Sequence, residues 1–291
     1  MSEVVSLAGL SANRYTLFKI FKYVVYSLLA YNVYAFFLEN HAAAGTVFAD
    51  GISLGKIIEA YNDSIDTLAW VVLLLVFELE TWVLSDEKLK GATKWALNAV
   101  SAFCYVFIVY SFYGYFSEMV TVTNLLPASA AACDLAANGG WSMVLEQDDY
   151  VALTAANCGS LADASLLQLA DAQVVGSAEV WREIQWLAWV DVINSGAWLL
   201  VVAILTFDVW LQLRHQLSDS IMRYSQVIKG ILYFTLLLCA IYWGVNGSFL
   251  DFWDAFLWLV AFFFIEMNLF EWQAETSTET STEASVEESA E

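Results

Sequence analysis

The stretch Asp63-Ser64-Ile65-Asp66-Thr67-Leu68-Ala69-Trp70 places two acids and a tryptophan at a spacing that recurs twice without a gap. The other copies are Asp191-x-x-Asn194-x-x-x-Trp198 and Asp251-x-x-Asp254-x-x-x-Trp258. Each copy is followed by a second polar-aromatic pair, namely Glu80-x-Trp82, Asp208-x-Trp210 and Asn268-x-Phe270. Recurrence at a fixed spacing indicates an internal repeat, which constrains the fold more than any single motif.

Between the first motif of each copy and the polar-aromatic pair that follows it, the chain is almost wholly apolar. The whole protein is 60% hydrophobic, with a mean hydropathy of +0.60, whereas soluble domains are about 45–50% apolar. Blocks of about 20 apolar residues are long enough to cross a bilayer as helices. We expect six spans, at roughly 20–38, 66–84, 97–117, 186–208, 230–247 and 254–271.

The repeat and the spans together predict an all-α integral membrane protein over residues 1–272. Its six transmembrane helices form three repeated hairpins, at about 20–84, 97–210 and 230–272, around a pseudo-threefold internal repeat. A competing interpretation of the first block is a signal peptide, because Ala42-Ala43-Ala44 follows it and small residues of that kind precede cleavage sites. The long segment before the block favours a span.

Lysine and arginine set the expected orientation. With the N-terminus in the cytoplasm, nine of the eleven lie on the inner side, and only Lys56 and Arg182 lie outside. This asymmetry follows the positive-inside rule and places both termini in the cytoplasm. A cytoplasmic helix is expected at 209–229, where apolar residues follow helical spacing. The Glu/Ser/Thr/Ala tail at 273–291 is expected to be a disordered acidic segment.

The second outer loop, residues 119–180, is the longest. It holds seven Asp or Glu and no Lys or Arg. Cys133 and Cys158 both fall in it, and a pair of cysteines outside the cytoplasm predicts a disulfide. A short helix on the membrane surface is expected at 165–175. Cys104 and Cys239 fall within spans and are expected to be small apolar core residues.

The acids of the repeat are the candidate functional residues at the outer ends of the even-numbered helices. Around the helix axis, Asp63, Asp66 and Trp70 share one face. If the repeated faces converge, one acidic mouth forms, made of Asp63, Asp66, Asp191, Asp251 and Asp254. The alternative is that these acids only cap helix N-termini and complement the helix dipole.

A second set of acids lies near the cytoplasmic ends of the spans and consists of Glu78, Glu80, Asp208 and Glu266. Acids there are disfavoured by the helix dipole, and within a span each costs about 2.5–3.5 kcal/mol on insertion scales. Such residues face a bundle interior or a wet cavity. The alternative is that these acids extend to the membrane interface, or pair with a nearby base: Lys88, Lys90, Arg214 or Lys229.

These residues favour a cation or proton channel or transporter with a carboxylate-lined path. The alternative is a non-catalytic membrane subunit or scaffold of a larger complex, whose acids are capping residues and whose tryptophans dock partners. An enzyme is not expected, because no nucleophile–base pair or phosphate-binding motif occurs. With only His41 and His215, no haem or other cofactor is expected, and the metal, if any, is undefined. The expected partners are the lipid bilayer, a cation, and a second copy or a membrane-complex subunit, and not nucleic acid, since the net charge is −21.

Overall fold

The structure is a computed structural model that describes residues 2–48, 51–52, 56–84, 88, 90–162, 164–214 and 218–264. The chain divides into two compact units, a large one of residues Ala30–Ala255 and a small one of Met1–Leu29 with Phe256–Glu291. The helices are α1 Ser2–Val47, α2 Ile57–Ala60, α3 Asn62–Glu78, the π-helix η2 Leu79–Val83, α4 Ala92–Thr123, α5 Ala132–Asn138, the 3₁₀ helix η3 Cys158–Leu161, α6 Ala178–Leu213, α7 Asp219–Asn246 and a last helix at 249–264. The strands are β1 Leu126–Pro127, β2 Ser142–Glu146, β3 Asp149–Ala152, β4 Leu166–Gln168 and β5 Val174–Ser177.

Four helical segments are long and apolar enough to cross a membrane. They are Leu17–Val47, Ala92–Thr123, Ala178–Gln212 and Ser220–Asn246. The described residues therefore account for four of the six expected spans. The expected span at 66–84 corresponds to α3, which has 17 residues, and to η2. Of the span expected at 254–271, residues 254–264 are helical, and the remainder lies outside the described residues.

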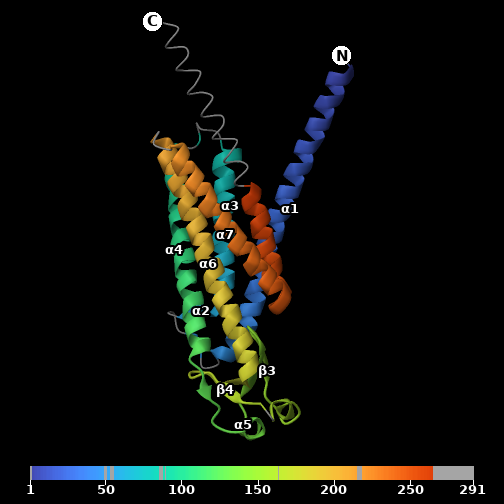
Figure 1. Cartoon of the computed structure of the whole chain (residues 1–291), viewed down its shortest axis with the longest axis vertical. Coiled ribbons are helices and arrows are strands. Elements are labelled where there is room, and N and C mark those ends of the chain that lie inside the picture. The colour runs from blue at the N-terminus through green and yellow to red at the C-terminus, as the bar shows by residue number, and fades with distance from the viewer. Residues whose placement is uncertain are drawn as a thin grey trace. The chain divides into compact units, whose positions relative to one another are not determined.

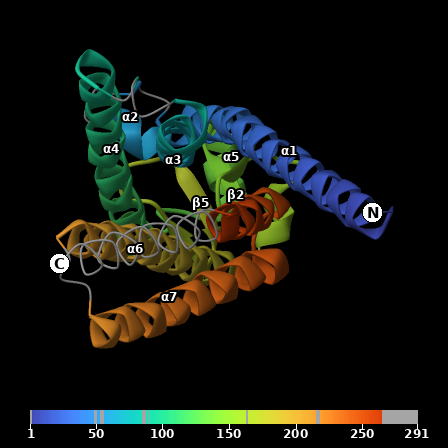
Figure 2. The ribbon, with the colours of Figure 1, turned by 90° about the horizontal axis from the view of Figure 1, so that it is seen from above.

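Within the large unit, α3, α4, α6 and α7 pack side by side in that order (Figure 1, Figure 2). α6 begins at a serine cap, where Ser177 Oγ accepts from the backbone N–H of Val180 at 3.2 Å. α7 begins in the same way, with Ser218 accepting from Ile221. Side-chain caps of this kind satisfy backbone donors that the first helical turn leaves free.

The expectation of an all-α protein is wrong. The loop between α4 and α6 folds into a five-stranded sheet with the order β1-β4-β5-β2-β3, in which only β2 and β5 run parallel. The sheet lies where α4 ends and α6 begins (Figure 1). Its strands are three to five residues long apart from the two-residue β1, and such short strands carry little periodic signal.

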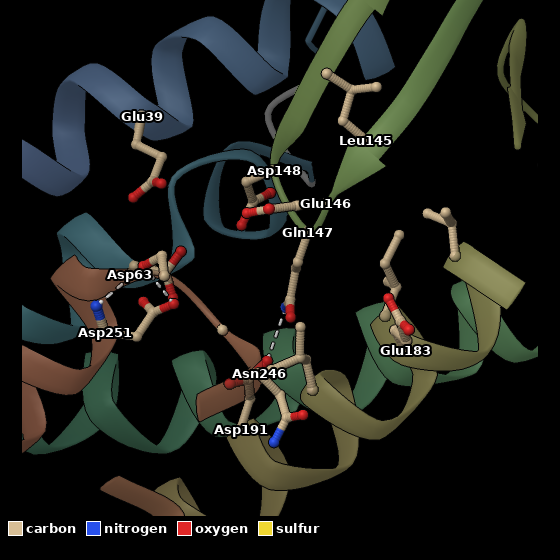
Figure 3. Close-up of a pocket in the computed structure, with 15 residues that line it drawn as sticks. Glu39, Asp63, Leu145, Glu146, Gln147, Asp148, Glu183, Asp191, Asn246 and Asp251 are labelled. Carbon is tan, nitrogen blue, oxygen red and sulfur yellow. Dashed lines mark hydrogen bonds between the residues drawn. The ribbon is translucent and has the colours of Figure 1, made fainter. Parts of the chain in front are cut away.

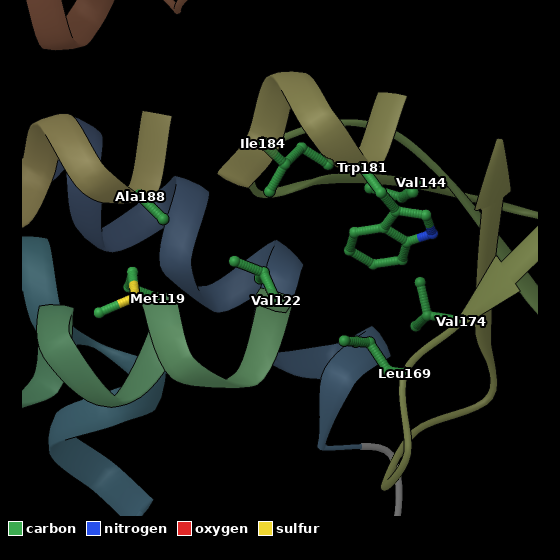
Figure 4. Close-up of a cluster of buried hydrophobic side chains, with 8 residues drawn as sticks. All are labelled: Met119, Val122, Val144, Leu169, Val174, Trp181, Ile184 and Ala188. Carbon is green, nitrogen blue, oxygen red and sulfur yellow. The ribbon is translucent and has the colours of Figure 1, made fainter. Parts of the chain in front are cut away.

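A buried apolar cluster joins this sheet to the helices (Figure 4). Its centre is Trp181, which is 1% exposed and donates its indole N–H to the Leu167 carbonyl at 3.0 Å. Val144 and Val174 pack on it from the sheet, and Met119 belongs to the same cluster from α4. Gly176 allows this close packing, because a Cβ there would lie 2.5 Å from Val144 Cγ1. The sheet is therefore anchored to the ends of α4 and α6.

The predicted disulfide is confirmed. Cys133 of α5 bonds Cys158 of η3, with their Cα atoms 5.0 Å apart. Around it Leu135, Leu161 and Val175 form a second small core. Cys104 and Cys239 are free and buried, as expected of apolar core residues.

Two expected helices are wrong. Residues 165–175 contain β4 and the start of β5, which bond to each other as antiparallel strands, so ladder pairing replaces the helix. The segment 209–229 is not one helix, because α6 ends at Leu213 and α7 begins at Asp219. Its apolar stripe belongs to two successive helices.

In the small unit, the Phe264 ring meets Phe18 and Phe21 edge-on, with ring centroids 4.9 and 5.7 Å apart. Such edge-to-face pairs are favoured by the quadrupoles of the rings. Glu266 and the acidic tail at 273–291 lie outside the described residues.

Candidate functional site

A pocket of about 90 Å³ opens in the large unit beside the sheet. Seven of its fifteen lining residues are acidic and none is basic. We call it the acidic pocket, and its carboxylates are those of Glu39, Asp63, Glu146, Asp148, Glu183, Asp191 and Asp251 (Figure 3). The volume is enough for several water molecules or a small cation.

The acidic pocket brings together the first residue of each motif copy. Asp63 lies in the first turn of α3, Asp191 lies on α6, and Asp251 lies at the start of the helix at 249–264. Figure 3 shows Asp63 and Asp251 next to each other, with Asp191 on the far side of the pocket. Of the five acids expected around one mouth, Asp63, Asp191 and Asp251 line this pocket, whereas Asp66 and Asp254 do not.

Neighbouring polar side chains hold the carboxylates of Asp63 and Asp251 in place near the ends of their helices. Asn40 of α1 donates to Asp63 Oδ2 at 2.9 Å, and its oxygen accepts from Ser64 Oγ at 2.6 Å. Ser248 Oγ donates to Asp251 Oδ2 at 2.8 Å and accepts from the Asp251 backbone N–H at 3.1 Å. Hydrogen bonds to a carboxylate fix its orientation and partly offset its desolvation.

The tip of the β2–β3 hairpin reaches into the acidic pocket. Gln147 Nε2 donates to Asp191 Oδ2 at 2.8 Å and to Glu118 Oε1 at 3.1 Å, so one amide links α6 to α4. Asp148 follows with a φ of 64°, and no other described non-glycine residue has a positive φ. Aspartate tolerates this left-handed conformation better than most residues. The turn thereby directs a further carboxylate into the pocket.

The crowded acids shift each other's protonation. Desolvation raises the pKa of Asp148 well above its usual range, and the charges of Glu118 and Asp63 raise it further. Desolvation and then Asp63 raise the pKa of Asp251 to about 7, against a hydrogen bond from Ser248 that lowers it. The pocket can therefore take up and release protons near neutral pH.

The second motif positions lie one helical turn further along. Tyr115 of α4 donates to Asp66 Oδ2 at 3.5 Å, and Asn32 of α1 donates to Asp254 Oδ1 at 2.7 Å. One turn beyond Asp66, Trp70 meets Trp198 with ring centroids 6.4 Å apart. Trp70 also packs on Cys104 and Ile108, so the polar layer ends at an apolar one.

The described acids at the opposite ends of the helices, Glu78, Glu80 and Asp208, do not line the acidic pocket. Asp208 of α6 accepts from Ser225 Oγ and lies 3.5 Å from Lys229 Nζ, so it is paired with one of the bases considered above. Glu78 is buried at the end of α3, and Glu80 is partly exposed on η2. Glu266 lies outside the described residues, so the structure gives no position for it.

Sequence reasoning missed four of the seven acids that line the acidic pocket, Glu39, Glu146, Asp148 and Glu183, as well as Gln147 and its partner Glu118. Glu39 and Glu118 fall just past the expected ends of spans 20–38 and 97–117. An acid is common there, at the boundary between bilayer and water, and does not indicate a site. Gln147 and Asp148 belong to the acidic outer loop, whose sheet was not foreseen. Their one available signal was the charge of that loop, seven acids and no base.

No group of three or more His, Cys, Asp or Glu side chains in the described part of the chain is arranged to hold a metal ion. The acidic pocket supplies negative charge and exchangeable protons. Comparison of the chain with protein-family models, curated proteins and solved structures finds no match.

Proposed function

We propose that this protein is a six-span membrane protein, built of three repeated hairpins, that passes protons or other cations through a path entered at the acidic pocket. The observation that carries the proposal is the meeting of Asp63, Asp191 and Asp251 in one cavity. The role of helix caps alone does not explain why these three acids line one pocket, because a cap needs no contact with the other two.

Electrostatics supports the same function. A concave site lined by one sign of charge raises the local concentration of counter-ions. The rate at which they associate with the site rises by about 10 to 10³-fold. Asp251, whose pKa is raised to about 7, can exchange protons at the pH of most cell exteriors. In the proposed orientation the pocket lies outside the cytoplasm, on the disulfide side.

The basic residues of the large unit support that orientation. Lys90 and Lys94 precede or begin α4, and Arg214 and Arg223 lie at the end of α6 and the start of α7. These are the helix ends away from the sheet (Figure 1). Under the positive-inside rule, this distribution favours a position of the sheet and the pocket outside the cytoplasm.

The test is ion flux into liposomes that contain the purified full-length protein. Joint replacement Asp63→Asn, Asp191→Asn and Asp251→Asn should lower proton or cation flux at least about tenfold, because the pocket loses its attraction for cations. The matched control removes three exposed acids of the same loop and helix start, by Asp149→Asn, Asp171→Asn and Glu179→Gln. It should retain wild-type flux. If the wild-type protein passes no ion, the scaffold alternative replaces this proposal.

A further inference from the structure

Tyr115 lies between the carboxylates of two successive motif positions. Its phenol donates to Asp66 Oδ2 at 3.5 Å, a long hydrogen bond, and Asp63 is the second carboxyl group in its surroundings. Asp63 lines the acidic pocket, whereas Asp66 does not. One hydroxyl group therefore connects the pocket to a carboxyl group that lies one turn deeper on α3.

The layer around Asp66 holds further polar atoms that are buried and unsatisfied. Ser111 lies one turn from Tyr115 on α4, is fully buried, and its hydroxyl has no hydrogen-bond partner among the described residues. The same is true of both amide atoms of Asn62, which press against Gly114, and of Asp66 Oδ1. Each such atom costs about 1–3 kcal/mol. A polar layer kept at that cost next to an apolar tryptophan layer is expected to have a function.

The chemistry of this connection fits a proton better than a metal ion. The described residues offer no three-ligand set for a metal, and a phenol cannot replace a cation's hydration shell alone. A phenol can accept one proton and donate another without changing position. We propose that Tyr115 relays protons from Asp63, at the acidic pocket, to Asp66 within the helix bundle.

The transfer conserves protons and needs no other reactant. The proton on the Asp63 carboxyl moves to the Tyr115 oxygen while the original phenolic proton moves to Asp66. Rotation of the new O–H about the ring C–O bond restores the starting state, and one proton has moved inward. The relay rests on the proposed function and specifies the ion as H⁺.

The experiment compares Tyr115→Phe with Tyr113→Phe in liposomes containing the full-length protein. Tyr113 is two residues away on the same helix and is 60% exposed, so its replacement removes a phenol outside the relay. Proton flux should fall by about 100-fold in Tyr115→Phe, the lower end of the contribution of a positioned proton-transfer group. It should stay at the wild-type rate in Tyr113→Phe. Unchanged proton flux in Tyr115→Phe overturns the relay.

Infrared difference spectra give a second measurement that a purely structural role of Tyr115 would not change. A pH step should produce a carboxyl band that disappears in Asp66→Asn and shifts in Asp66→Glu. In Tyr115→Phe this band should be absent while the band of Asp251 remains. If the Asp66 band persists in Tyr115→Phe, the relay is wrong.

Flux in the wild-type protein separates the two proposals. Flux of Na⁺ or K⁺ without proton flux would leave the proposed function in place and refute the relay. Absence of any flux would refute the proposed function, and the relay would then be decided by the infrared band alone.

Discussion

Asp251 illustrates how one residue responds to the acids around it. Its carboxyl group has a pKa of about 7 instead of 3.8, mainly through desolvation and the charge of Asp63. A carboxyl group whose pKa is raised by folding holds its proton more tightly in the folded protein. Its effect on stability is nil below about pH 4, and it destabilises the fold increasingly as the pH rises to about 7.

The first prediction follows from this loss of stability at higher pH. The wild-type protein in detergent should melt at a lower temperature at pH 8 than at pH 4.5, and Asp251→Asn should reduce this difference. A shift of about three units corresponds to at most about 4 kcal/mol, and partial exposure lowers it, so we expect an effect on the order of 5 °C. Thermal scans of tryptophan fluorescence measure it. Asp171→Asn, at an exposed position, should follow the wild type, and an equal pH effect in both variants would show that Asp251 is not responsible.

At the scale of elements, one buried ion pair ties α6 to α7. Asp208 and Lys229 expose about 9% and 10% of their side chains, and Ser225 donates to the same carboxylate. Removing one partner of a buried pair leaves an uncompensated charge, which costs about 3–5 kcal/mol, whereas removing both is often neutral. The pair therefore holds two helices in register more than it adds net stability.

Lys229→Met should accordingly lower the melting temperature by an amount on the order of 10 °C. The double variant Asp208→Asn with Lys229→Met should recover most of that loss. Lys90→Met, at an exposed position, serves as the control. A double variant as unstable as Lys229→Met would mean that Lys229 acts through its packing and not through its charge.

These elements also show what the sequence can and cannot predict. The long helices and the disulfide followed from blocks of apolar residues and from the pairing of Cys133 with Cys158, both of which are local signals. The sheet did not, because its strands are short and β2 pairs with β5 about 30 residues away, a contact that periodicity does not encode. The recurrent spacing around Asp63, Asp191 and Asp251 suggested a shared site from the sequence alone. The positions of Gln147 and Asp148 could not be predicted, because they depend on the sheet.

At the scale of the molecule, the segregation of charge predicts how the protein lies in a membrane. Ser129 is exposed on the sheet side of the large unit, and Lys90 is exposed at the other end of α4. In intact cells, an impermeant maleimide should label Ser129→Cys but should label Lys90→Cys only after permeabilisation. Cys104 and Cys239 are buried and should contribute little background. Labelling in the reverse order would invert the proposed orientation.

The residues of the acidic pocket come from positions as far apart as Glu39 and Asp251. During synthesis, which adds about 5–20 residues per second, the segment that carries Glu39 is made well before Asp251, the last of these acids, leaves the ribosome. A nascent chain therefore has no assembled pocket. If the pocket opens the proposed path, a partly synthesised chain cannot leak ions, because that opening forms only after Asp251 has been made.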